Sequence, residues 1–171
     1  MIDEPTLEFM AIRLQKKGRP QFIANWSLKT ILFCLGSFAK DGTQGSGLRL
    51  NHPRARRMAN DWLSAGSIPP APPLLVAIGQ GSTFTPHPAH PESGFGTLKL
   101  PLSKFIDVCD GIHRIAALRQ LDLPSKSLTE SEWPVEYIEC SDLEDAGCLI
   151  DNLRKESKRK PQQKTPKTGS E

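Results

Sequence analysis

The segment FIDVCDGIHRIAAL, residues 105–118, constrains the fold more than any other part of the chain. An apolar run ends at Asp110 and Gly111, and a helical pattern with His113 and Arg114 in its first turn follows directly. The first amides of a helix have no partners within the helix. A helix start of this kind therefore attracts phosphate or carboxylate groups. The sequence predicts that chemistry or anion binding takes place at this corner.

The other elements predict an α+β (α/β-like) domain, with a mixed sheet and flanking helices. The run LLVAIG is continuously apolar, which is typical of a strand buried on both faces, and we expect it at the centre of the sheet. Strand patterns cover residues 7–14, 21–26, 74–79, 97–100, 105–109 and 133–140, and helical patterns cover residues 28–35, 53–65, 111–121 and 142–156. Residues 80–96, rich in Gly, Ser, Pro and His, predict a long exposed connection without regular structure.

Local signals mark the ends of the helices. Ser27 can cap the first helix, which Gly36 ends. Asn51 or His52 can cap the second helix, because Pro53 suits a first turn whose amide needs no partner. We expect Met58, Trp62 and Leu63 to form the apolar stripe of that second helix.

Length and composition narrow the class of protein. A chain of 171 residues fits one domain. Its apolar stretches fall far short of the roughly 18 residues that a membrane span requires, and the first residues lack a secretory pattern. The four cysteines show neither C-x-x-C nor Cys/His spacing. We therefore expect a cytoplasmic protein with no membrane association, no metal and no cofactor.

Charge is unevenly distributed along the chain. Residues 154–171 contain seven Lys/Arg and two Asp/Glu, whereas residues 1–153 contain fifteen basic and seventeen acidic groups. The last part has no large apolar side chain and cannot offset the entropy of folding. We expect a folded domain over residues 1–155 and a disordered basic tail over residues 156–171.

Basic residues supply the candidate phosphate ligands. They are Arg13 and Arg19 in the first hairpin, Arg54, Arg56 and Arg57 on the second helix, Gly111, His113 and Arg114 at the corner, and Lys158, Arg159 and Lys160 in the tail.

The corner also has other interpretations. In an enzyme, Asp110, His113 and Arg114 would be the candidate catalytic residues, with His113 as general base and Arg114 stabilising a phosphoryl group. In a purely structural interpretation, Asp110 caps the helix, His113 makes a core hydrogen bond, and Arg114 pairs with an acid such as Asp107.

The sequence DGIHRIAAL resembles the D-G-Q-H-R signature of the DndB family of DNA sulfur modification proteins. Other stretches agree in order, namely FMAIRLQKKGRPQFIANWSL, LNHPRARRMANDWL, PPLLVAI, GTLKLPL and WPVEYIECSDLEDAGCLIDNLRK, so that the likeness covers about residues 7–155. Members of the family usually continue further, and we therefore expect a short or truncated member. The strand-turn-helix also resembles, more distantly, the ParB and sulfiredoxin fold.

The resemblance implies a DNA-binding regulator of a DNA phosphorothioation system, within restriction-modification, that controls transcription of the modification genes. DNA is then the expected partner, and other sulfur modification proteins or a second copy of the chain are further partners. The ParB likeness implies an alternative, a nucleotide-hydrolysing or DNA-nicking enzyme. Ile112 weakens that alternative, because it replaces the signature's glutamine and cannot orient a water molecule. A second alternative is a protein-docking module without affinity for DNA.

Overall fold

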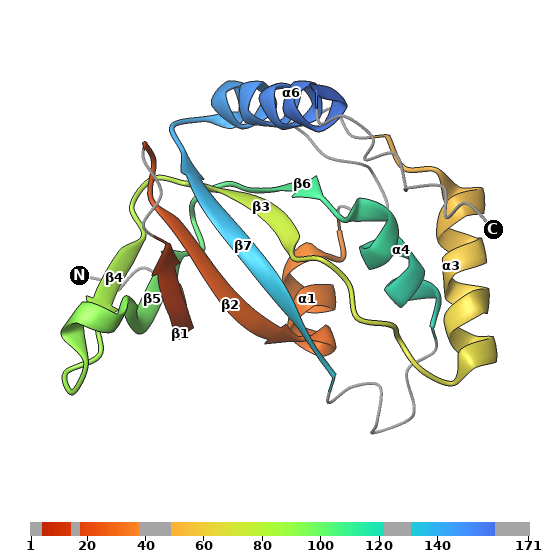
Figure 1. Cartoon of the computed structure of the whole chain (residues 1–171), viewed down its shortest axis with the longest axis horizontal. Helices are drawn as coiled ribbons and strands as arrows, with labels where there is room; N and C mark the ends of the chain where they lie inside the picture. The colour runs from red at the N-terminus through yellow and green to blue at the C-terminus, as the bar shows by residue number, and fades with distance from the viewer. Residues whose placement is uncertain (1–4, 15–17, 38–48, 122–130, 160–171) are drawn as a thin grey trace, which may run out of the picture.

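The computed structural model describes residues 5–14, 18–37, 49–121 and 131–159. These residues form one mixed seven-stranded sheet with helices on both faces (Figure 1). The fold is α+β, as predicted. The elements are β1 (Thr6–Leu14), β2 (Gln21–Ser27), α1 (Leu28–Leu35), α3 (His52–Ala65), β3 (Leu74–Gly79), β4 (Thr83–Pro86), the 3₁₀ turn η1 (Pro91–Ser93), β5 (Phe95–Pro101), β6 (Ile106–Asp110), α4 (Ile112–Gln120), β7 (Glu132–Cys140) and α6 (Leu143–Arg159).

The strand order is β4-β5-β1-β2-β7-β3-β6. Neighbouring strands are antiparallel except β3 and β7, which run parallel with Leu74 opposite Val135. The LLVAIG run forms β3, and its residues are buried as predicted, apart from the half-buried Leu75. However, β3 lies next to the edge strand β6 rather than at the centre of the sheet.

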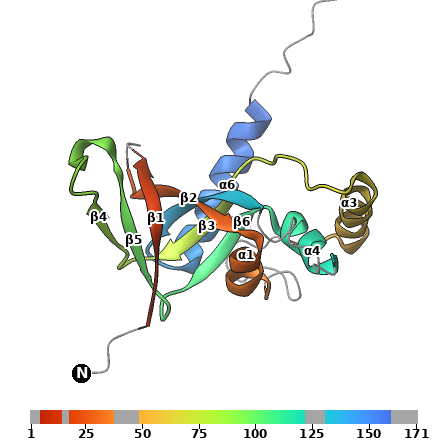
Figure 2. The same ribbon diagram turned by 90° about the horizontal axis from the view of Figure 1, so that it is seen from below.

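Two apolar clusters cover the two faces of the sheet. The larger cluster joins α1, α3 and α4 to one face, with Ile31, Ile115 and Val76 fully buried. The smaller cluster joins α6 to the other face of β3, β6 and β7 through Ala146 and Ile150. α4 contacts both α1 and α3. Figure 2 shows α3 at the outer end of the molecule, beyond α4.

The helix caps confirm the local signals. Ser27 Oγ accepts a hydrogen bond from the Thr30 N–H at 3.2 Å, and Gly36 ends α1. Asn51 Oδ1 accepts one from the Arg54 N–H at 3.0 Å, so Asn51, and not His52, is the cap of α3.

The structure confirms two residues of the apolar stripe expected for α3, since Trp62 is buried and the half-buried Met58 packs against the core, but it corrects the third. The buried side chains are Ala55, Ala59 and Trp62, whereas Leu63 is 57% exposed. Small alanines let α3 approach α4 closely, and Trp62 contacts the ring of Trp133 edge-on with centroids 5.7 Å apart. A search for large apolar residues alone does not detect such an interface.

Two further boundaries differ from the sequence-based prediction. The connection over residues 80–96 contains the strand β4, which pairs with β5, and Phe84 packs on Phe22 with ring centroids 5.6 Å apart. Phe22 is distant along the chain, so no local pattern reveals that Phe84 packs on it. At the other end, α6 continues to Arg159, beyond the expected boundary at residue 155, and residues 160–171 lie outside the described residues.

Candidate functional site

The corner between β6 and α4 is tightly packed around Gly111. Gly111 has a φ of 98°, and a Cβ atom there would lie 2.3 Å from Leu74 Cδ2. Its N–H donates to Asp110 Oδ1 at 2.8 Å, and its carbonyl accepts from the Arg114 N–H at 2.9 Å. The structure therefore requires glycine at this position for steric reasons.

Arg114 is engaged by the protein itself. Its guanidinium donates to the carbonyl oxygens of Pro72 and, at 3.2 Å, of Pro73. Asp110 lies 3.5 Å from Nη2, and the guanidinium lies 5.9 Å from the centre of the Trp133 ring. The side chain is only 12% exposed, and this burial lowers the pKa of Arg114, although Asp110 opposes the shift. Arg114 therefore fastens the segment that enters β3, a role that the structural interpretation, which expected an acidic partner, did not include.

Asp110, rather than Asp107, is the acid that contacts Arg114. Asp107 is fully buried in β6, where its Oδ1 accepts a hydrogen bond from the Val108 N–H at 3.0 Å. Asp110 does not cap α4 with its side chain, because the cap position belongs to Gly111.

His113 connects α4 to the start of α3. Its Nε2 accepts a hydrogen bond from the Asn51 N–H at 3.0 Å, which requires that Nε2 carry no proton. Burial lowers the pKa of His113, the positive charge of Arg54 lowers it further, and Asp110 acts in the opposite direction. The bonded nitrogen is therefore not available as a base while this contact is intact.

Positive charge is concentrated at the outer side of the α3 N-terminus. Two adjoining depressions share His52 and Pro53 in their lining. We call this region the α3 arginine surface; its basic residues are Arg49, His52, Arg54, Arg56 and Arg57, and His113, whose Nε2 carries no proton, also lines it. The four arginines are exposed, and the first turn of α3 contains no acidic residue. Within the described part of the chain, none of their guanidinium groups forms an ion pair.

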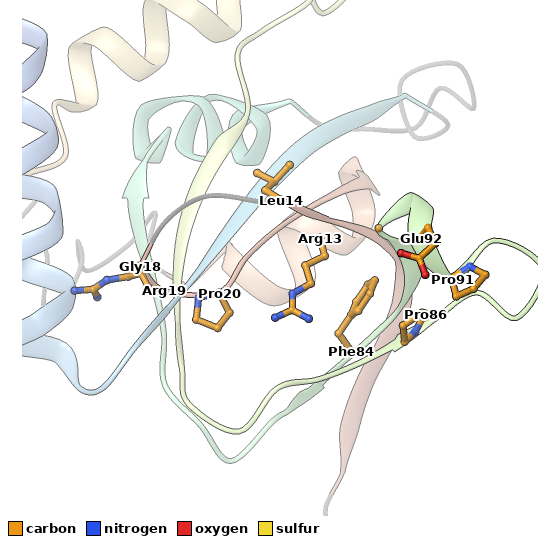
Figure 3. A pocket seen from close by; sticks show the side chains of 10 residues that line it. Arg13, Leu14, Gly18, Arg19, Pro20, Phe84, Pro86, Pro91 and Glu92 are labelled. Atoms are coloured by element: carbon orange, nitrogen blue, oxygen red, sulfur yellow. The ribbon is translucent and has the colours of Figure 1, made fainter.

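The two hairpin arginines have different roles. Arg19 donates to both carboxylate oxygens of Asp145, at 2.7 and 2.8 Å, and thereby attaches the β1–β2 hairpin to the start of α6. Arg19 lowers the pKa of Asp145 to about 2, chiefly through this hydrogen bond. Arg13, by contrast, lines an open pocket beside Phe84 (Figure 3).

The remaining predicted ligands are not brought to the arginine surface by anything in the described residues. Lys158 and Arg159 belong to the last turn of α6, and Lys160 lies outside the described residues. Apart from Gly111 and the residues at the end of α6, the predicted ligands therefore separate into the arginine surface, the engaged Arg19 and Arg114, and Arg13 in β1.

The described residues contain no group of three or more His, Cys, Asp or Glu side chains placed to hold a metal ion. His87 and His90 stack on each other with ring centroids 6.1 Å apart. All four cysteines are free, and burial raises the pKa of Cys109 to about 12, so this thiol stays protonated at neutral pH.

Comparison with known proteins gives no relative, since neither a protein-family model, nor a curated protein, nor a solved structure matches the chain. Fold and site therefore define the class: an α+β protein with a mixed seven-stranded sheet and an arginine-rich surface at one end. Among the described helices, none is both long and apolar enough to cross a membrane.

Sequence reasoning missed four residues that the structure places in depressions. Arg49 and His52 extend the arginine surface, and the basic run RLNHPRARR contains the signal that could have found them. Phe84 and Glu92 line the pocket of Arg13. No pattern in the sequence marks these two residues, because residues 80–96 are rich in Gly, Ser, Pro and His and show no strand or helix periodicity.

Proposed function

We propose that this protein binds DNA through the α3 arginine surface. The observation that carries the proposal is the group of Arg49, Arg54, Arg56 and Arg57, exposed together at the start of one helix. Guanidinium groups bind phosphate oxygens through two parallel hydrogen bonds. Neutralising several phosphates releases counterions and supplies most of the affinity for DNA.

The motif at residues 110–114 has a supporting role in this proposal. Arg114 holds the entry to β3, and His113 holds the Asn51 amide at the first turn of α3. Both contacts fix the orientation of α3 relative to the sheet. The motif thus positions the arginines on α3 and does not bind phosphate through Arg114.

The regulatory role is the more specific part of the proposal. The likeness of DGIHR and the surrounding segments to the DndB family supports a regulator of DNA phosphorothioation genes. Phosphate contacts position a protein but do not read sequence. A regulator of this kind therefore also needs base contacts, which the outer face of α3 can supply through Arg56, Arg57 and Asn60.

Salt dependence tests the binding surface. DNA affinity of the full chain is measured by fluorescence anisotropy at several salt concentrations, and compared with that of Arg54→Gln/Arg56→Gln/Arg57→Gln. We expect the triple variant to bind more weakly. The slope of log K against log salt is negative, and its magnitude should be smaller in this variant by roughly 2–3. The matched control is Lys29→Gln/Lys99→Gln/Lys104→Gln, which removes the same charge from exposed positions elsewhere.

Equal weakening in both triple variants would contradict the assignment of this surface. Absence of salt-dependent binding would instead favour the protein-docking alternative. The regulatory role is tested with DNA from upstream of sulfur-modification genes, which should bind more tightly than unrelated DNA of equal length.

The enzyme alternative has its own test. Hydrolysis of ATP or GTP, or nicking of DNA, that disappears in His113→Ala while the fold is retained would support it. The contacts of His113 and Arg114 count against it, since both side chains are bonded to other parts of the protein. The side chain of Asp110 bonds only within its own motif in the described residues and is 70% exposed.

A further inference from the structure

The strands β4 and β1 lie on the opposite side of the molecule from α3 (Figures 1 and 2). A pocket lies there, lined by residues of β1, β4, η1 and the turn between β1 and β2. It has a volume of about 360 Å³. Small-ligand sites generally measure roughly 300–1,000 Å³, so this pocket has room for one small molecule. The side chains in its lining that carry the inference are Arg13, Phe84 and Glu92, with Pro20, Pro86 and Pro91 around them.

Arg13 supplies a positive charge with which no acidic group of the described residues forms an ion pair. Its backbone is fixed, because the Arg13 N–H donates to the Gly94 carbonyl at 2.7 Å. Its guanidinium, however, has neither a hydrogen bond nor an ion pair to any residue in the described ranges. Figure 3 shows this group on the Phe84 side of the pocket, whereas Arg19 points away from it. A guanidinium in this setting is suited to a phosphate or carboxylate.

Phe84 supplies a flat apolar surface next to this charge. Its ring is half-buried and rests on Phe22, which is itself 3% exposed, so that the position of the ring is fixed. Aromatic rings in binding sites stack on nucleobases, because every base has a flat π-face. A ring that is supported from below and open on the pocket side serves as a stacking platform.

Glu92 supplies the complementary hydrogen-bonding group. It lies in η1, and Figure 3 shows its carboxylate on the pocket side of that turn. An ionised carboxylate only accepts hydrogen bonds. The Watson–Crick edge of guanine presents two adjacent donors, N1–H and the 2-amino group, whereas adenine presents one donor beside an acceptor.

We propose that this pocket binds a guanine nucleotide, with the base stacked on Phe84, the base edge paired with Glu92 and the phosphate paired with Arg13. This site is separate from the α3 arginine surface and does not rest on the DNA-binding proposal. Its ligand is a free nucleotide or a guanine nucleotide unit within a single strand, since both present the same chemistry.

Isothermal titration of the full chain with GMP, AMP, guanosine and inorganic phosphate tests the proposal. We expect GMP to bind at least ten-fold more tightly than AMP, guanosine or phosphate. Arg13→Gln and Glu92→Gln should each weaken GMP binding at least five-fold. Both side chains are exposed, so these variants should fold normally, which circular dichroism checks. Phe84→Leu should also weaken binding.

The triple α3 variant is the control and should bind GMP as the natural sequence does. Equal affinity for GMP and AMP, unchanged binding in Glu92→Gln, or no GMP binding would overturn the proposal. A single-stranded oligonucleotide with one central guanine distinguishes the two sources. Tighter binding of this strand than of GMP identifies a nucleic-acid unit as the ligand, and weaker binding identifies the free nucleotide. In both cases the Arg13→Gln variant must bind the ligand more weakly than the unchanged chain does.

Discussion

The guanidinium of Arg114 reaches from α4 to the carbonyl oxygens of Pro72 and Pro73, and its planar shape matches two adjacent acceptors. A residue type associated with phosphate binding is here used to fasten a proline-rich segment. The sequence alone does not distinguish an arginine that is exposed to solvent from one that is bonded within the protein. The difference is set by residues that lie 42 and 41 positions away along the chain.

Replacement of Arg114 separates these two roles. Arg114→Ala leaves two carbonyls without donors and should lower the free energy of unfolding by about 2 kcal/mol. Arg114→Lys should recover only part of this loss, because an ammonium cannot reproduce the forked contact. Urea denaturation provides the measurement. Unchanged stability combined with loss of DNA affinity would show that Arg114 binds phosphate directly.

His113 should make stability depend on pH. Its pKa lies below the ordinary value of 6.5 in the folded protein, so folding favours the neutral ring. This contribution is complete above about pH 6.5 and is lost as the pH falls through the folded pKa. We expect the urea midpoint to decrease from pH 7.5 to 5.5, and to decrease less in His113→Gln. The exposed His90→Gln is the control and should keep the decrease of the natural sequence.

At the scale of elements, the strand-to-helix corner depends on the absence of a side chain at Gly111. Gly111→Ala combines a positive φ with a contact of 2.3 Å to Leu74. Gly66→Ala, at φ 64° and with no atom within 4 Å of the added carbon, is the matched control. In the control, the positive φ alone should lower the free energy of unfolding by about 1 kcal/mol. Gly111→Ala should lower the free energy of unfolding by a further 1–3 kcal/mol, roughly the cost of overpacking. Equal decreases in the two variants would exclude the steric explanation.

The ion pair between Arg19 in the β1–β2 hairpin and Asp145 in α6 should affect the stability of the protein at acidic pH. Arg19 holds the pKa of Asp145 at about 2, below its ordinary 3.8. The ion pair therefore contributes fully above about pH 4, and the contribution is lost as the pH falls towards 2. Asp145→Asn should flatten the decrease of the thermal midpoint between pH 4 and pH 2. Glu144→Gln, in the same helical turn, should leave it unchanged.

The elements that could be predicted are those specified by their own residues. Ser27, Asn51 and Gly36 mark helix ends through hydrogen bonds within a few residues, and the sequence shows them directly. β4 could not be predicted, because its partners lie in β5 and at Phe22. The same limit applies to the site, since Arg54 to Arg57 could be placed on one helix, whereas the engagement of Arg19 by Asp145 could not be foreseen.

For the whole molecule, the two proposed binding surfaces belong to α3 and to the region of β1 and β4, which lie on opposite sides of the molecule (Figure 1). Sites this far apart, with no shared residues, should act independently. Saturating GMP should therefore leave the affinity for DNA unchanged within about two-fold, an interaction of about 0.4 kcal/mol. Anisotropy titrations of DNA with and without GMP give the comparison. A larger change would mean that the ligands communicate through the sheet.

The position of β7 between β2 and β3 has a consequence for synthesis of the chain. Residues 132–140 form the last strand of the described part of the chain, and they are synthesised after the strands on both sides of them, yet they join the two halves of the sheet. Until they emerge, β2 and β3 each present an unpaired edge, and such edges readily pair with other chains. A nascent chain that still lacks residues 132–140 cannot close its sheet, so it should aggregate more readily than the chain in which β7 is present.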